Sequence, residues 1–265
     1  MEREVTADGI HLGRGGDPSG PPVVFVHGAM DRGAAFLRVT RLLADVDWWV
    51  YDRRGYGRSV TERPADLDGH VADLVALLEI VRERTGARPV VAGHSLGGTI
   101  ALAAAHRRPD LVAAVVAYEA PLTWAEWWPR RGPGGSNPED DEPAVAAERF
   151  MRRVAGDDVW ESMSDATRTR RLDEGRALVA ELSSARRAAA FVPVEIGVPA
   201  TISRGSPTDG YRERAARVLH EEIPGAELVV LDGADHGAHV SRPAEFAALV
   251  RRALDRAGRS GDRAL

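Results

Sequence analysis

The stretch that most constrains this chain is Gly93-His94-Ser95-Leu96-Gly97-Gly98, which contains a G-x-S-x-G pattern. A short apolar run at residues 88–92 precedes it and suits a buried strand, and a strong helix former at residues 99–106 follows it. A serine in this context sits on a sharp strand-to-helix turn, with its hydroxyl exposed at the end of a sheet. Side chains at the flanking glycine positions would collide with the neighbouring strand or helix. The pattern therefore predicts Ser95 as a nucleophile.

Length and composition limit the classes of protein to which the chain can belong. With 265 residues and 44% hydrophobic content, it can build one large α/β domain or a core domain with a small insertion. The 35 basic residues are scattered among 40 acidic ones, and the formal charge of -5 argues against nucleic acid as a partner. The absence of cysteine excludes disulfides, thiolate metal sites and cysteine nucleophiles.

The sequence also carries no recognisable targeting signal. The first five residues lack the charged start and apolar stretch of a signal peptide. No apolar run approaches the roughly 18 residues of a membrane span. We therefore expect a cytoplasmic protein with no membrane partner, present as a monomer or a homodimer.

Strand-like and helix-like segments alternate along most of the chain, which predicts a mainly parallel sheet. Residues 5–12 show a hairpin pattern around Asp8-Gly9, a favoured tight turn. The other expected strands are residues 21–26, 48–51, 88–92, 111–118, 199–203 and 226–231. The expected helices are residues 33–44 with Asp31 as the cap, 66–86, 99–106, 211–220 and 243–257.

This alternation is interrupted after Pro121. Residues 122–143 hold three tryptophans followed by many glycines, prolines and acidic residues, which indicates an irregular segment. Residues 144–190 read as charged helices. We therefore predict a core domain formed by residues 1–121 and 191–265, and a helical cap formed by residues 122–190.

A nucleophilic serine needs a general base, an orienting acid and an oxyanion hole. His236 is the candidate base, because it follows the expected strand 226–231 directly and lies on the loop before the last helix. Loops at the carboxyl ends of parallel strands are where catalytic groups and ligands meet. His239 is a competing candidate that fits a packing or hydrogen-bonding role better.

The order and spacing of these motifs resemble the α/β-hydrolase superfamily over nearly the whole chain. The matching pieces are Val26-His27-Gly28-Ala29, the run from Tyr51 to Ser59, the turn around Ser95 and Gly233-Ala234-Asp235-His236. Pro243 lies seven residues after His236, as is usual for the histidine loop of that family, and this favours His236 over His239. The resemblance implies an α/β-hydrolase fold, a mostly parallel, doubly wound sheet with an inserted helical cap. It says much less about the substrate.

The family resemblance assigns a role to each residue of the expected site. It implies Ser95 as the nucleophile and His236 as the general base. The backbone N–H groups of Leu96 and Ala29 would form the oxyanion hole, with His27 bracing the loop that carries Ala29.

The acid departs from the commonest family pattern, an aspartate in a G-x-x-D turn. Here that slot holds Thr208, and Asp209 comes one residue late. Glu119 ends the expected strand 111–118, the position that haloalkane dehalogenases and zearalenone-lactone hydrolases use, and its Glu-Ala-Pro run resembles the latter group. A glutamate that ends a buried strand needs a partner, which an imidazole N–H can supply. Glu119 is the favoured acid and Asp209 the alternative.

The pocket residues are open to two interpretations. Trp124 and Trp128, near the start of the expected cap, would either form an aromatic wall of a substrate pocket or pack the cap on the core. His94 and Met30 are further candidates for the pocket lining, and His94 has a structural role as its alternative. Histidines and carboxylates do not fall at metal-ligand spacings, so neither a metal nor another cofactor is expected.

The combined pattern predicts a serine hydrolase that cleaves a small-molecule carboxylic ester or lactone through an acyl-enzyme on Ser95. A thioesterase, a carbon–carbon bond hydrolase or a cyclase of natural-product metabolism would use the same triad. A non-catalytic small-molecule receptor is the remaining alternative. Haloalkane dehalogenase and epoxide hydrolase chemistry is disfavoured, because those relatives have an aspartate where Ser95 stands.

Overall fold

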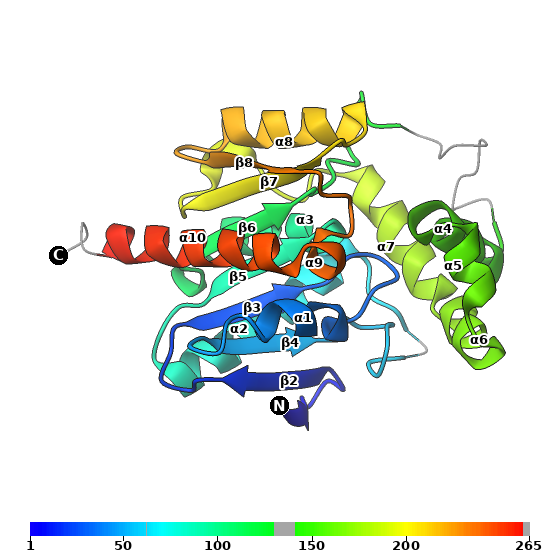
Figure 1. Ribbon diagram of the computed structural model, residues 1–265, viewed down its shortest axis with the longest axis horizontal. Coiled ribbons are helices and arrows are strands. Elements are labelled where there is room, and N and C mark those ends of the chain that lie inside the picture. The colour runs from blue at the N-terminus through cyan, green and yellow to red at the C-terminus, as the bar shows by residue number, and fades with distance from the viewer. Residues whose placement is uncertain (62, 130–140, 262–265) are drawn as a thin grey trace.

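A computed structural model describes residues 1–61, 63–129 and 141–261 of the protein. Its centre is an eight-stranded sheet with the order β1-β2-β4-β3-β5-β6-β7-β8 (Figure 1). The strands are β1 (Glu2–Val5), β2 (His11–Gly16), β3 (Pro22–Val26), β4 (Asp47–Tyr51), β5 (Val90–His94), β6 (Ala114–Tyr118), β7 (Ala200–Ser206) and β8 (Glu227–Asp232). Strands β3 to β8 pair in parallel, while β1 and β2 form an antiparallel hairpin at one edge.

Helices cover both faces of this sheet, which confirms the predicted doubly wound α/β fold. The helices of the core are α1 (Leu37–Thr40), α2 (Leu67–Thr85), α3 (Leu96–Arg107), α8 (Gly210–Glu222), α9 (Ala238–Ser241) and α10 (Pro243–Gly261), with 3₁₀ turns η1 (Gly33–Phe36), η2 (Pro109–Leu111) and η3 (Pro193–Glu195). In Figure 1, α1, α9 and α10 lie in front of the sheet and α2 and α3 behind it. Every residue of the four central strands is buried, which explains their unbroken apolar runs.

The helix expected over residues 33–44 is shorter than predicted, and its proposed cap is wrong. Arg32 is at the N-cap of η1 and makes no capping hydrogen bond through its side chain, and only residues 33–40 are helical. The Asp31 carboxylate instead accepts a hydrogen bond from His239. A contact between residues 208 positions apart therefore replaces the local capping interaction that the sequence suggested.

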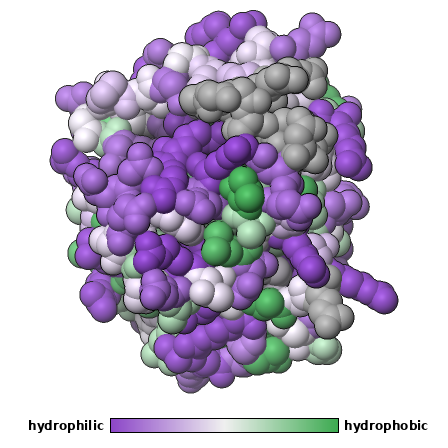
Figure 2. Space-filling view, turned by 90° about the vertical axis from the view of Figure 1, so that its right-hand side faces the viewer, coloured by the Kyte–Doolittle hydropathy of each residue, from purple (hydrophilic) through white to green (hydrophobic). Residues whose placement is uncertain are grey.

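Four more helices lie between β6 and β7, to one side of the sheet in Figure 1. They are α4 (Pro143–Ala155), α5 (Asp157–Ser162), α6 (Asp165–Asp173) and α7 (Gly175–Arg187), and we call them the helical segment. Part of the irregular stretch expected at 122–143, namely residues 130–140, lies outside the described residues. Figure 2 shows that the described surface on this side is mainly hydrophilic, with small separate hydrophobic spots.

A buried ion pair joins the helical segment to the core. Arg53, on the loop after β4, donates to Glu181 of α7 at 2.6 Å, and both side chains are fully buried. The Tyr56 hydroxyl donates to the Glu181 carboxylate at 2.6 Å, and His70 Nε2 lies 3.1 Å from that carboxylate. Burial raises the pKa of Glu181, but these partners outweigh it and lower the pKa to about 2. The carboxylate is therefore ionised and fully engaged across the boundary between core and helical segment.

Glu181→Gln is expected to destabilise the protein by about 3–5 kcal/mol, because it leaves the Arg53 charge buried without a counter-charge. Glu213→Gln is the matched control, since it breaks the Arg204–Glu213 pair, in which Glu213 is half exposed. That change is expected to cost less than about 1 kcal/mol. Urea denaturation of both variants measures the difference. Similar midpoints for the two variants would show that the buried pair adds no special stability.

Candidate active site

Three loops that follow parallel strands carry the strained residues of this protein. Among the described non-glycine residues, only Met30, Ser95 and Glu119 have a positive φ, at 55°, 52° and 46°. Each follows the carboxyl end of a central strand, respectively β3, β5 and β6. Strained backbone of this kind persists where surrounding structure fixes it, and it clusters at functional sites. The strain therefore marks the same edge of the sheet as the sequence motifs.

Ser95 lies on the sharp turn that the glycine pattern predicts. Its backbone has φ 52° and ψ -128°, and its N–H donates to the carbonyl of Tyr118 at 2.8 Å. A Cβ at Gly93 would clash with the backbone of Gly97, and a Cβ at Gly97 would clash with the carbonyl of Val26. Only glycines at both positions let the turn sit this close to β3 and the start of α3.

The structure places His236 against Glu119. His236 Nδ1 lies 2.6 Å from Glu119 Oε2, and the other carboxylate oxygen accepts the N–H of Gly205 at 3.1 Å. Glu119 is 2% exposed, so its charge is held almost entirely by these partners. The hydrogen bond on Nδ1 leaves Nε2 as the basic nitrogen of a neutral imidazole. The hydrogen bonds of the described residues include none between the Ser95 hydroxyl and His236, a contact that often tightens only when substrate binds.

Burial and neighbouring charges shift both members of this pair. Burial raises the pKa of Glu119, but the hydrogen bond and charge of His236, together with Gly205 and Thr208, lower it below its ordinary value. Burial lowers the pKa of His236, and the nearby Arg212 and His239 lower it further, against the opposing effect of Glu119. At neutral pH the pair is therefore an ionised carboxylate beside a neutral imidazole, the state that a general base requires.

If His236 is the base, the acidic limb of kcat/KM against pH is expected to have its midpoint below pH 6.5, the ordinary pKa of histidine. Activity is lost only as the pH falls through this lowered pKa, because the protonated imidazole cannot accept a proton. Arg212→Gln is expected to move the midpoint upward, since it removes a positive charge 3.8 Å from Glu119. Arg217→Gln, on the exposed side of the same helix, is the control. A midpoint above 6.5 in the wild type would contradict the assignment.

Asp209, the alternative acid, has other partners. Its carboxylate caps α8 by accepting the N–H of Arg212 at 3.1 Å, and it pairs with the guanidinium of Arg212 at 2.7 Å. The side chain of Thr208, in the slot where relatives have aspartate, hydrogen-bonds to Glu119. The loop after β7 therefore supports Glu119 without supplying the carboxylate itself.

The loop after β3 is held close to Ser95. A Cβ at Gly28 would lie 3.1 Å from the Cβ of Ser95, so glycine permits the approach. Arg53 donates to the carbonyls of His27 and Gly28 at 3.0 and 2.9 Å, and its backbone N–H donates to His27 Nε2 at 2.9 Å. Burial lowers the pKa of His27 to about 3, so this bracing histidine is neutral. The next residue on this loop is Ala29, one of the two expected oxyanion donors.

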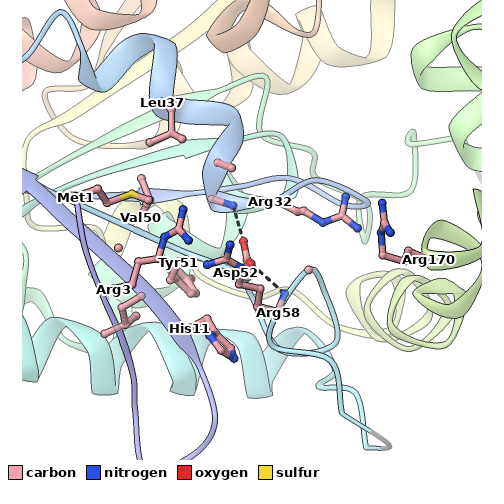
Figure 3. A pocket seen from close by; sticks show the side chains of 15 residues that line it. Met1, Arg3, His11, Arg32, Leu37, Val50, Tyr51, Asp52, Arg58 and Arg170 are labelled. Atoms are coloured by element: carbon pink, nitrogen blue, oxygen red, sulfur yellow. Dashed lines mark hydrogen bonds between the residues drawn. The ribbon is translucent and has the colours of Figure 1, made fainter. Parts of the chain in front are cut away.

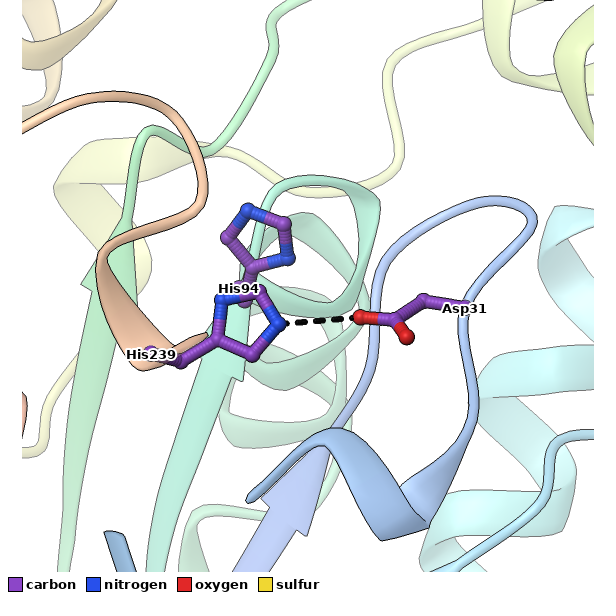
Figure 4. A group of neighbouring side chains, drawn as sticks. All are labelled: Asp31, His94 and His239. Atoms are coloured by element: carbon purple, nitrogen blue, oxygen red, sulfur yellow. Dashed lines mark hydrogen bonds and ion pairs between the residues drawn. The ribbon is translucent and has the colours of Figure 1, made fainter. Parts of the chain in front are cut away.

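Asp31, His94 and His239 form a cluster (Figure 4), and its member His94 packs against His236. The rings of His94 and His236 lie 4.7 Å apart and those of His94 and His239 lie 4.1 Å apart. His94 Nε2 donates to the carbonyl of His236 at 2.7 Å, and His239 Nε2 donates to Asp31 at 3.0 Å. His94 thus holds the backbone of the His236 loop. The Tyr118 hydroxyl donates to the carbonyl of Asp235, the residue before His236, at 2.6 Å.

The same cluster is the group of described residues that could hold a metal ion. Ligand atoms of Asp31, His94 and His239 lie within 4.8 Å of one another. The Asp31–His239 hydrogen bond and the bond from His94 to the His236 loop already engage one atom on each of the three residues. These hydrogen bonds explain why the three side chains lie together: they support the loop that carries His236.

The other expected pocket residues make packing contacts. Trp124 meets Phe191 edge-on with ring centroids 5.3 Å apart, and Trp128 meets Tyr211 of α8 at 4.8 Å. Both tryptophans are half-buried. Met30 is buried in a cluster with residues of the helical segment, among them Met151, Trp160 and Leu178. Met30 therefore links the loop after β3 to the helical segment.

Sequence reasoning missed the long-range partners of the site. The structure adds Arg53 with Glu181, Thr208 beside Glu119, and Asp31 with His239. The run Tyr51 to Ser59 contained Arg53, but nothing local distinguishes a buried arginine from a solvated one. The pairs within this set are separated by 89 to 208 residues in sequence, so no local spacing could have identified them.

Fold and site together define an α/β protein built around a serine on a strand-to-helix turn. The chain belongs to the alpha/beta hydrolase family, whose model matches residues 23–249. It is therefore a member of a family of hydrolases. In the described residues, no helix is long and apolar enough to cross a membrane.

Individual relatives resemble only part of the chain. Lipase LipV of Mycobacterium tuberculosis is 39% identical over 109 residues, and the human monoglyceride lipase is 35% identical over 121 residues. An epoxide hydrolase of Caballeronia sordidicola is 32% identical over 128 residues. These matches cover 40–46% of this chain and 37–40% of the relatives.

Solved structures match over nearly the full length. The enol-lactonase from Burkholderia xenovorans superimposes with a TM-score of 0.73 and 21% identity, covering 96% of this chain and 100% of that one. The bromoperoxidase from Bacillus anthracis gives a TM-score of 0.75 and 20% identity over the same shares. At 20–21% identity, this similarity shows a shared fold and nothing about the reaction.

Proposed function

We propose that this protein is a serine hydrolase that cleaves a small-molecule carboxylic ester or lactone through an acyl-enzyme on Ser95. The observation that carries the proposal is the 2.6 Å contact between Glu119 and His236, at the same sheet edge as a serine with positive φ. Such a carboxylate fixes the tautomer and orientation of the imidazole and stabilises the imidazolium that forms during reaction.

In the proposed reaction, the Ser95 hydroxyl attacks the substrate carbonyl while His236 Nε2 takes the hydroxyl proton. The N–H groups of Ala29 and Leu96 stabilise the negative oxygen of the tetrahedral intermediate. His236 then gives the proton to the departing alkoxide, and the acyl group remains on Ser95. A water molecule, deprotonated by His236, hydrolyses this acyl-enzyme and restores the free serine.

We further propose that residues 122–190 act as a cap over the site, with residues 1–121 and 191–265 as the core. The helical segment packs on Met30, four residues after the end of β3, and Arg53 joins it to the loop beside Ser95. In this arrangement Trp124, Trp128, His94 and Met30 line or support the substrate pocket. Excluding water from the site strengthens the interactions of the oxyanion with its donors.

The names of the relatives support an ester-type substrate. Two of the sequence relatives are named as lipases, and one structural neighbour as an enol-lactonase. The epoxide hydrolase relative points to a different reaction, but that chemistry uses a carboxylate nucleophile where this chain has Ser95. A hydroxyl nucleophile with a histidine base fits acyl transfer better.

Labelling with a fluorophosphonate probe tests the proposal. Intact-protein mass is expected to show a single added phosphonyl group, and peptide mapping is expected to place it on Ser95. A panel of esters, lactones, thioesters and carbon–carbon bond substrates then ranks the reaction types by kcat/KM. Failure of the folded protein to react with the probe would contradict an activated Ser95 and would favour a receptor role. Preference for thioesters or diketones would replace the ester proposal with another reaction of the same triad.

A further inference from the structure

A cavity lies at the β1–β2 edge of the sheet, and its lining includes Arg170 of α6 (Figure 3). Its volume is about 320 Å³, and Ser95, Glu119 and His236 are not among its lining residues. The walls come from the hairpin, the end of β4, the turn η1 and the loops after β3 and β4, with Arg170 contributed by α6. The site proposed above leaves this cavity without a role.

The lining of this cavity is unusually basic for a chain with a formal charge of -5. It includes Arg3, Arg32, Arg58 and Arg170, against a single carboxylate, Asp52. The Asp52 oxygens accept the backbone N–H groups of Gly33 and Arg58, each at 3.0 Å, so this carboxylate holds two loops in place (Figure 3).

Three of the four arginines have no carboxylate partner among the residues that the structure describes. Arg32 pairs with Glu174, whereas Arg170 donates only to the hydroxyl of Thr167. The side chains of Arg3 and Arg58 make no hydrogen bond or ion pair within the described chain. Like charges that share a pocket repel one another, and an anion placed between them relieves that repulsion.

Part of the cavity wall is apolar. Met1, Leu37 and Val50 line it, and Figure 3 shows Met1 and Val50 beside Arg3, at the far end from Arg32 and Arg170. Arginine guanidinium groups bind carboxylate and phosphate oxygens with paired hydrogen bonds, while an apolar wall accepts a hydrocarbon group. The lining therefore matches a molecule with a charged head and a short apolar body.

We propose that this cavity binds a small amphiphilic anion, in which a carboxylate or phosphate monoester is carried on a short hydrocarbon chain. The head group lies between Arg3 and Arg58, and the hydrocarbon chain lies against Met1, Leu37 and Val50. This binding is independent of the hydrolytic activity proposed above.

Calorimetric titration with hexyl phosphate and with hexanoate tests the proposal on the whole protein. At least one of the two is expected to bind with a one-to-one stoichiometry, and the comparison identifies the preferred head group. Inorganic phosphate alone and hexanol alone are each expected to bind more weakly. The double variant Arg3→Gln/Arg58→Gln is expected to raise Kd by about tenfold or more, because two charge-assisted contacts are lost. Arg88→Gln, an exposed arginine before β5, is the control and is expected to keep the wild-type Kd.

Two further measurements separate this site from the site at Ser95. Protein already labelled with the phosphonate probe is expected to bind the preferred anion with an unchanged Kd, and binding is expected to weaken as the salt concentration rises. The ligand-free double variant is expected to keep its Tm, which shows that it folds. The proposal is wrong if neither anion binds the wild type, if the double variant binds as tightly, or if phosphonate labelling blocks binding.

Discussion

Replacing Ser95 by alanine is expected to lower kcat/KM toward the best ester substrate by about 10⁴-fold or more. The variant loses the attacking oxygen, while the oxyanion donors and the substrate contacts remain and keep only the residual rate. Steady-state kinetics with a chromogenic ester measures the loss. The fold is expected to be unchanged, because Ser95 contributes its backbone N–H, and not its side chain, to the bond with Tyr118.

The matched control is Ser162→Ala, which removes a hydroxyl that bonds only within the exposed end of α5. Its kcat/KM is expected to equal that of the wild type within a factor of about two, since surface changes of this kind are nearly neutral. An Ser95→Ala variant that keeps a tenth or more of the wild-type activity would place the nucleophile elsewhere.

The second large effect is expected for substitution of Glu119, the favoured acid of the triad. Glu119→Gln is expected to lower kcat by about 10³–10⁴-fold, because an amide can hold His236 in the wrong tautomer and cannot stabilise the imidazolium. Asp209→Asn is expected to change kcat by only a few-fold, since asparagine also caps a helix and Asp209 has no contact with His236. Measuring both variants under saturating substrate compares the two candidate acids directly. The reverse order of effects would assign the acid to Asp209.

Much of the fold was predictable, because the signals that specify it are local. The unbroken apolar runs identify buried strands, and the helix over residues 66–86 has its cap at Asp66, which accepts the N–H of Gly69. The serine turn is also local, since the two glycines leave room for neighbouring backbone. Asp31 shows where this reasoning fails. A side chain that could cap the next turn binds His239 instead, and no property of residues 31–44 indicates that partner.

The candidate site likewise has residues that the sequence predicts and supporting contacts that it does not. Glu119 was favoured over Asp209 because a carboxylate at the end of a buried strand needs a partner, and the structure supplies that partner in His236. The supports of the site were not predictable, because Arg53 meets Glu181 across 128 positions and only the folded chain brings them together. The arginine-lined cavity was not predictable either, since Arg3 of β1 and Arg170 of α6 lie 167 residues apart in the sequence.

The buried Arg53–Glu181 pair also limits which segments of this protein can be deleted or exchanged. The Arg53 guanidinium donates to the carbonyls of His27 and Gly28. It also pairs with the Glu181 carboxylate of α7, which neutralises its charge. A chain that lacks residues 143–187, or that carries another segment there without an acidic residue in place of Glu181, would leave that guanidinium without a counter-charge beside the loop that carries Ala29. A transplanted segment therefore needs an acidic residue at the position of Glu181, and α7 cannot be exchanged independently of the loop that carries Arg53.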